Sequence, residues 1–241
     1  MIVSSQTETN VQEIQDGLYR INTPVSIIPG GFSFNQYLIV DEQPLLFHTG
    51  PRKMFPIVHE AVSRVIGPET LRFIAFSHVE SDECGSLNQW LEVAPGAVPL
   101  CSETAAIVQI SDLADREPRA LANNERVVLG KHVLQWIDTP HLPHGWECGY
   151  LFDETTGTLL CGDLFTQPGL GEDALAKSDI LEPSEAMRQQ MDYFSHCKNA
   201  PELMQRLIDK KPTTLACMHG SAWNGNGAEL LRQLLLRLNA D

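Results

Sequence analysis

The segment from residue 71 to residue 83 constrains this chain more than any other part of its sequence. Residues 71–77 are mostly apolar and read as a buried strand, and the polar run His78-Val-Glu80-Ser-Asp82-Glu follows directly. Because side chains alternate along extended backbone, we expect His78, Glu80 and Asp82 to face one point beyond the strand's end. One imidazole and two carboxylates make a poor core but a good metal site. The segment therefore predicts a metal site at the end of a buried strand.

Three later residues strengthen that prediction. His144, Asp163 and His219 each follow an apolar segment, at the point where a strand would give way to a loop. Together with Glu83, the two sets of residues supply four carboxylates, which would repel one another without a cation. Two divalent ions bring four positive charges and would balance them. The sequence therefore favours a site for two metal ions.

The order of these residues resembles that of the metallo-β-lactamase superfamily, whose hydrolases carry His-x-His-x-Asp-His followed by a His, an Asp and a His. It is more similar to the iron branch of that superfamily, the flavodiiron proteins and the stand-alone oxygen-binding diiron proteins. In that branch the second His of the motif is a Glu, as Glu80 is here. The 18 residues 145–162 between His144 and Asp163 match the flavodiiron spacing. His141 would leave 21 intervening residues, 142–162, so we prefer His144 as the ligand.

Two positions depart from the flavodiiron pattern. Glu83 stands where flavodiiron proteins have a His on the second iron. It either binds metal through oxygen or turns away, since a carboxylate directly after Asp82 points outward unless the turn is tight. His48 stands where the superfamily often has an Asp, and it is either a hydrogen-bond partner of a ligand or an ordinary histidine at a strand end.

The resemblance implies a fold and a ligand set. The fold is α/β, an αβ/βα four-layer sandwich (the metallo-β-lactamase fold), whereas periodicity alone indicates only a mixed α/β chain. Its ligands lie at one edge, on loops held by strand ends. The implied site holds one ion on three residues, a second ion on two or three, and a bridging carboxylate between them: His78, Glu80 and His144; Asp82, His219 and Glu83; and Asp163. Because carboxylates equal or outnumber imidazoles, two iron ions are expected, with zinc or manganese as alternatives.

Length, composition and charge set broader limits. The 241 residues, 43% of them hydrophobic, can form one large α/β domain or two small ones with a sizeable core. The resemblance implies a single metallo-β-lactamase-like domain over residues 1–241, without a flavodoxin domain or bound flavin. A net charge of −14 argues against binding nucleic acid or an anionic membrane. The polar N-terminus shows no signal peptide, and no apolar run reaches 18 residues, so we expect a cytoplasmic protein. The six cysteines are expected to be free thiols, with Cys84 and Cys148 beside the ligand segments.

Local patterns predict further elements. Short strands are expected at Leu18–Val25, 34–40 and 44–48, and helices at 55–66, 103–115, 184–197 and 228–239. The last of these carries a leucine stripe typical of core packing. Several other residues are weaker candidates. His59, His132 and His196 are expected to be ordinary histidines, while Trp146, Phe165 and Tyr193 could line the pocket.

Three classes of function fit these expectations. The first is a non-haem diiron protein that binds, senses or reduces dioxygen, served by a separate redox protein. The second is a dinuclear metallohydrolase of a small ester, lactone or phosphodiester, against which Glu80 argues. The third is a signalling module that docks a partner and uses its metals as a redox switch. We favour binding or sensing of dioxygen, because no electron-delivering domain is expected, and the resemblance adds a homodimer.

Overall fold

Within residues 9–239, which the computed structural model describes, the strands form two sheets. The first sheet has seven strands in sequence order: β1 (Asn10–Gln15), β2 (Leu18–Val25), β3 (Phe32–Ile39), β4 (Leu45–Phe47), β5 (Phe73–Ala75), β6 (Val98–Ser102) and β7 (Arg119–Leu121). The second sheet has six strands in the order β13 (Trp223–Asn224), β12 (Thr214–Ala216), β11 (Thr158–Leu160), β10 (Gly149–Asp153), β9 (Val133–Asp138) and β8 (Arg126–Val128). The predicted two-sheet α/β fold is confirmed.

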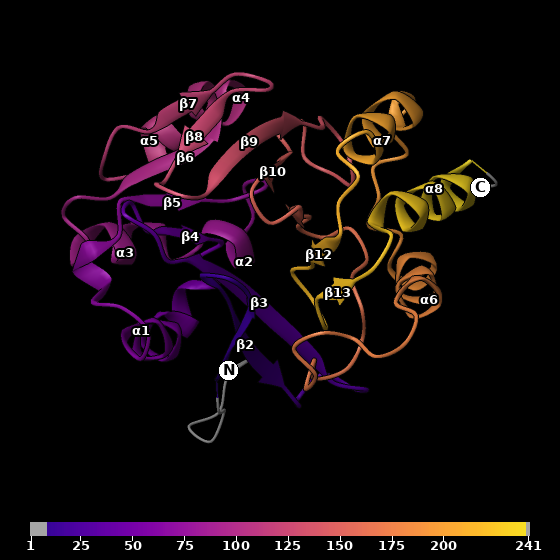
Figure 1. Ribbon diagram of the computed structural model, residues 1–241, viewed down its shortest axis with the longest axis horizontal. Coiled ribbons are helices and arrows are strands. Elements are labelled where there is room, and N and C mark those ends of the chain that lie inside the picture. The colour runs from indigo at the N-terminus through magenta and orange to yellow at the C-terminus, as the bar shows by residue number, and fades with distance from the viewer. Residues whose placement is uncertain (1–8, 240–241) are drawn as a thin grey trace.

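Helices cover the outer face of each sheet (Figure 1). The first sheet is covered by α1 (Phe55–Ser63) and α3 (Leu87–Val93), with the short 3₁₀ turns Arg52–Met54 and Pro68–Thr70 beside α1. The second sheet is covered by α6 (Leu181–Met191), α7 (Ala200–Ile208) and α8 (Gly227–Leu238). These two groups of helices stand at opposite sides of the view in Figure 1. The layers therefore follow the order helix, sheet, sheet, helix.

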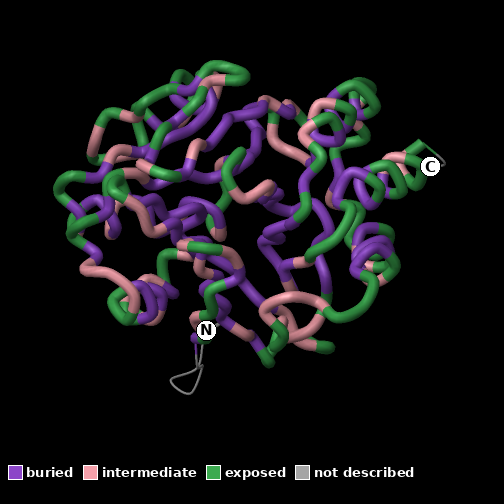
Figure 2. The backbone as a smooth tube through the Cα atoms, viewed as in Figure 1, coloured by how far each residue is buried: buried purple, intermediate pink, exposed green. Residues whose placement is uncertain are grey.

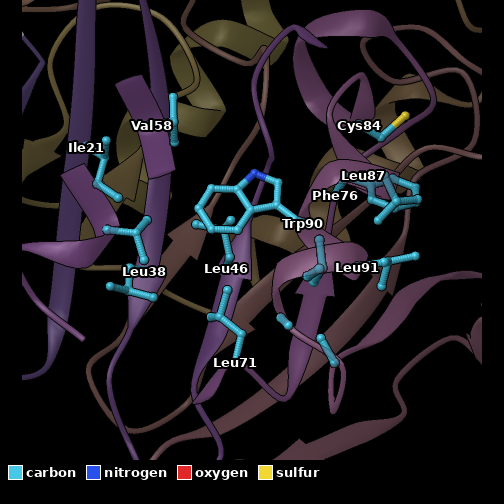
Figure 3. Close-up of a cluster of buried hydrophobic side chains, with 14 of the residues drawn as sticks. Ile21, Leu38, Leu46, Val58, Leu71, Phe76, Cys84, Leu87, Trp90 and Leu91 are labelled. Carbon is cyan, nitrogen blue, oxygen red and sulfur yellow. The ribbon is translucent and has the colours of Figure 1, made fainter. Parts of the chain in front are cut away.

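Alternation along the strands divides the core into three layers. Leu38 and Leu46 face the α1 and α3 side with Trp90, and Figure 3 shows this layer. Tyr37 and Phe47 face the other sheet instead, because successive strand residues point to opposite faces. Figure 2 shows the result as a buried interior under exposed outer helix faces.

The predicted helix over 103–115 is confirmed over residues 103–113, although it is not a regular α-helix. It runs without interruption through α4 (Glu103–Ala105), a π-helical turn (Ala106–Ile110) and α5 (Ser111–Leu113). Ile107 and Val108 in the π-helical turn lie on the surface. The predicted helix over 184–197 is also displaced, since α6 begins at Leu181 and ends at Met191, where Asp192 adopts a left-handed conformation with φ 50°.

Several short strands escaped prediction. Strands β1, β7 and β13 are edge or near-edge strands, and β1 is mostly polar and solvent-facing. A half-buried strand shows itself through apolar alternation, which these strands lack. Pairing with a neighbour, rather than local pattern, fixes them.

The carboxyl ends of β4, β5, β9, β11 and β12 open toward one edge of the sandwich. His48 and His78 follow the first two strands closely, and Asp163 and His219 follow the last two. The short helix α2 (Ser81–Cys84) lies near the middle of the view in Figure 1, between the two halves of the fold. No helix among residues 9–239 is long and apolar enough to cross a membrane.

Candidate metal centre

Seven side chains from four separate segments meet at the open edge of the sandwich. Their ligand atoms form three overlapping groups, and within each group all atoms lie within 4.8 Å of one another. The groups are His78, His144 and Asp163; His78, Glu80 and Glu83; and Asp82, Glu83 and His219. The structure thus brings together all seven residues that the sequence nominated for metal binding.

The helix α2 decides the position of Glu83. The chain leaves β5, is extended at Glu80 with φ −131° and ψ 169°, and then turns into a helix at Ser81. This tight turn carries Asp82 and Glu83 inward, so Glu83 is fully buried although it directly follows Asp82. Among residues 9–239, neither Glu83 carboxylate oxygen has a hydrogen-bond partner. A buried carboxylate without a donor is costly unless a cation satisfies it.

One end of the site gathers two imidazoles. The Nε2 atoms of His78 and His144 lie 2.9 Å apart. Asp163 Oδ2 lies 3.6 Å from the first and 3.3 Å from the second. Glu80 Oε1 is 3.1 Å from His144 Nε2. Two ring nitrogens and two carboxylate oxygens that face one point fit a shared cation.

The other end is richer in oxygen. His219 Nε2 lies 3.5 Å from Asp82 Oδ2 and 3.3 Å from Asp163 Oδ1. Asp163 therefore turns one oxygen toward each end, which is the geometry that a bridging ligand requires. Glu83 belongs to a group at each end, so it too can reach both.

Hydrogen bonds behind the site orient the histidines. Ser77 Oγ lies 2.9 Å from His78 Nδ1 and 3.0 Å from His48 Nε2. A metal-binding Nε2 carries no proton, so His78 Nδ1–H donates to Ser77, and the Ser77 hydroxyl donates to His48. His48 is fully buried in a left-handed conformation with φ 64°. Because Ser77 contacts both rings, His48 supports His78 through that hydroxyl. The Nδ1–H of His219 likewise donates to the Ser33 carbonyl at 2.8 Å.

A glycine makes the approach of Asp163 feasible. Gly162 has φ +48°, and a Cβ there would lie 2.9 Å from Ser77 Oγ and 3.0 Å from Tyr150 Cε1. A side chain would therefore collide with the relay behind His78. Only glycine adopts this backbone so close to neighbours without strain.

Burial and charge shift the pKa values of the cluster in opposite directions. Burial, followed by the charges of Asp163 and Asp82, raises the pKa of Glu83 well above its usual value. Burial alone would also raise the pKa of Asp163, but the hydrogen bond from His219 and the surrounding imidazoles lower it. The pKa of His144 is raised because Glu80 and Asp163 outweigh its burial. The site is thus short of positive charge, which is what metal cations would supply.

Other sequence candidates lie at various distances from this cluster. His141 is exposed and belongs to none of the three groups, so it is not the alternative to His144. Tyr193 does approach the site, because its hydroxyl donates to the Asp163 carbonyl at 3.0 Å. Cys84 is buried beside Glu80, and burial raises the pKa of its thiol to about 12. Trp146 is half-exposed, with 54% of its surface accessible.

Sequence reasoning missed two supporting residues. Ser77 connects His48 to His78, and Glu147 Oε1 accepts a hydrogen bond from the Val79 backbone at 2.9 Å. The position of Ser77 directly before His78 was its only local signal. Glu147 lies 68 residues from Val79, so nothing local could reveal that contact.

The same fold occurs in solved flavodiiron structures. A flavoprotein from Thermotoga maritima superposes with a TM-score of 0.87 over 99% of this chain and 63% of its own, at 19% identity. A fragment (residues 1–254) of diflavin flavoprotein A 5 from Nostoc sp. covers 98% of this chain and 97% of its own, with a TM-score of 0.78 and 17% identity.

The sequence relatives also include a diflavin flavoprotein and a flavorubredoxin. The chain is 28% identical over 178 residues to "Putative diflavin flavoprotein A 2" of Nostoc sp., which is 72% of this chain and 29% of that protein. It is 23% identical over 224 residues to the anaerobic nitric oxide reductase flavorubredoxin of Vibrio vulnificus, which is 87% of this chain and 44% of the relative. The chain thus spans less than half the length of these two relatives.

A family model gives the assignment. The model described as "ODP family beta lactamase" matches residues 32–220, which include all seven clustered side chains and most strands of both sheets. With the two-sheet fold and the flavodiiron relatives, this match identifies the chain as a member of the ODP family of β-lactamase-fold proteins.

Proposed function

We propose that this protein holds two iron ions at the seven-residue cluster and binds and reduces dioxygen there. The observation that carries the proposal is Glu83, a fully buried carboxylate whose oxygens have no hydrogen-bond partner in the described chain and which reaches both ends of the site. Such a carboxylate fits a pair of hard, oxygen-preferring cations.

The donor set favours iron over zinc. Four carboxylates and three imidazoles face the site, whereas zinc sites of hydrolases in this superfamily are rich in imidazole. Carboxylates also stabilise a ferric ion more than neutral imidazole does. His78 and His219 are held by Ser77 and Ser33 with Nε2 toward the site, so these ligands need little rearrangement to bind.

Electron counting points to a partner. A ferrous pair held by these residues would supply two electrons, enough to take dioxygen to the level of hydrogen peroxide, whereas reduction to water needs four. We therefore propose that electrons for continuous turnover come from a separate redox protein. A signalling protein that reads the oxidation state is the other partner we consider, and we propose a cytoplasmic homodimer.

The test compares metal-loaded forms of the whole protein. Iron-loaded, reduced protein should contain two ions per chain, consume dioxygen in a single turnover and change its visible absorption. Zinc-loaded protein should show neither oxygen consumption nor a spectral change, and serves as the matched control. If the zinc form hydrolyses a lactone or phosphodiester rapidly while the iron form ignores dioxygen, the hydrolase is the correct function.

A further inference from the structure

Two cysteine thiols face each other directly behind the metal centre. Cys161 follows β11 and Cys217 follows β12, and their Sγ atoms lie 3.8 Å apart. Neither residue exposes any surface to solvent. Both side chains point toward the layer under α6, α7 and α8. The pair is therefore shielded from bulky thiols and oxidants in solution.

The strand register suits a bond between the two sulfurs. Strands β11 and β12 are parallel neighbours in which Leu160 pairs with Ala216, and the Cys161 amide donates to the Ala216 carbonyl at 3.1 Å. Neighbouring strands lie about 4.8 Å apart, and disulfides span Cα separations of about 4.4–6.8 Å. Because an S–S bond is about 2.05 Å long, the sulfurs must close by about 1.8 Å from their 3.8 Å separation. Small side-chain rotations can supply that movement.

The pair is tied to the metal centre by sequence and by hydrogen bonding. Cys161 lies two residues before Asp163, and Cys217 lies two residues before His219. The Met218 amide donates to the Gly162 carbonyl at 2.8 Å, so the two intervening segments are bonded to each other. The metal centre is thus the nearest place where an oxidant could form beside these buried thiols.

We propose that Cys161 and Cys217 form a redox-active dithiol that closes to a disulfide by reducing hydrogen peroxide. One thiol attacks the O–O bond, giving a sulfenic acid and one water. The second thiol then displaces the hydroxyl, so that the S–S bond forms and a second water leaves. Two S–H bonds and one O–O bond break, the peroxide gains two electrons, and the dithiol loses two.

The inference rests on the proposed function only for the source of the peroxide. Two electrons from the iron pair would bring dioxygen to peroxide, and two from the dithiol would complete its reduction to two waters. A site whose iron pair and dithiol are both reduced would then convert one dioxygen molecule to two waters without releasing peroxide. A separate reductant would be needed afterwards to reopen the disulfide.

The direct test is a thiol inventory by mass spectrometry. Zinc-loaded protein is treated with hydrogen peroxide, quenched in acid, denatured and alkylated. Two of the six thiols should be lost, and a peptide pair linked through Cys161 and Cys217 should appear and vanish on reduction. Cys161→Ala and Cys217→Ala should abolish the linked pair, whereas Cys101→Ala, at a buried thiol in the first sheet, should keep it. Six free thiols after treatment, or a disulfide between other cysteines, would overturn the proposal.

A second measurement uses iron-loaded, reduced protein and dioxygen. Wild type and Cys101→Ala should release almost no hydrogen peroxide, whereas Cys161→Ala should release about one per chain at equal iron content. Equal release from all three would show that the dithiol does not serve the site. If no form consumes dioxygen but added peroxide still closes the Cys161–Cys217 bond in the zinc form, the dithiol stands and the oxygen-reducing function falls.

Discussion

At the scale of single residues, Glu83 is the carboxylate whose surroundings most clearly call for a cation. Its carboxylate is fully buried, its pKa is raised by burial and by Asp163 and Asp82, and its oxygens lack partners in the described chain. The Glu83 carboxylate should therefore change the stability of the protein in opposite directions with and without metal. It stabilises a loaded site and destabilises an empty one.

Replacing Glu83 by Gln should reveal both effects, on the stability of the metal-free protein and on metal binding. Without metal, Glu83→Gln should be more stable than wild type at pH 7 by roughly 1–3 kcal/mol, because a buried, repelled carboxylate is gone. With metal, the variant should bind fewer ions. Urea unfolding in chelator and metal analysis of the loaded proteins measure the two effects. Glu42→Gln, on the exposed surface, is the matched control and should change neither; a Glu83→Gln protein that keeps two ions contradicts a ligand role.

His48 predicts a pH dependence. Burial lowers its pKa well below 6.5 in the fold, whereas the unfolded chain titrates near 6.5. Below that pH the unfolded state gains a proton that folded His48 does not take up, so stability falls as pH falls. His48→Asn, which tolerates the left-handed backbone, lacks this titration. In metal-free protein, the stability advantage of wild type should shrink by about 2 kcal/mol between pH 7 and pH 5; a pH-independent difference in urea unfolding would contradict this.

How far the sequence predicts single residues depends on where their partners lie. The seven clustered residues were predictable because each carries a ligand atom at a strand end. The orientation of Glu83 was not, because it depends on where α2 begins. Ser77 and Ser33 support histidines through contacts that no local pattern encodes.

At the scale of elements, the turn after β11 matters because it positions Asp163 in the site. Gly162 combines φ +48° with close contacts to Ser77 and Tyr150. Gly162→Ala should therefore destabilise the protein by roughly 1–3 kcal/mol and reduce metal content by displacing Asp163. Gly169→Ala shares the positive φ, at +94°, but meets nothing within 4 Å. Calorimetry and metal analysis of both variants separate the collision from the backbone strain; equal losses would argue against the collision.

Prediction at this scale succeeded where a buried stripe repeats. The leucines of α8 recur at helical spacing and pack under the second sheet, so a helix was predicted within one residue of its bounds. A helix was also predicted correctly over most of residues 103–115, but nothing in its apolar pattern indicated the π-helical turn at Ala106–Ile110. Edge strands such as β7 were not predicted, because pairing with a neighbouring strand, and not their own residue pattern, makes them strands.

At the scale of the whole molecule, the site joins the two sheets. His78, Asp82 and Glu83 come from the segment after β5, while His144, Asp163 and His219 follow strands of the second sheet. Ions bound here would connect both halves of the fold. Their removal should therefore be felt in global unfolding and not only at the loops.

Metal binding should raise the unfolding temperature of the protein. Free metal at 100 times its dissociation constant adds about 2.7 kcal/mol for each ion, so two ions correspond to about 11–22 °C for a chain of 241 residues. Asp163→Ala should lose both ions and the whole shift, because each of its oxygens serves one end. Asp173→Ala, on an exposed loop, is the control. An Asp163→Ala protein that retains one ion with half the shift would show that Asp163 is not the bridge.

The shared carboxylates would also couple the binding of one metal ion to the binding of the other. Asp163 and Glu83 each reach both ends, so the first ion draws them into place for the second. One divalent ion also leaves two of four negative charges uncompensated. A second ion would thus meet a site that is already arranged and still attractive, so we expect metal loading to be positively cooperative. In a population short of metal, chains would then be either empty or full, with the half-filled form scarce.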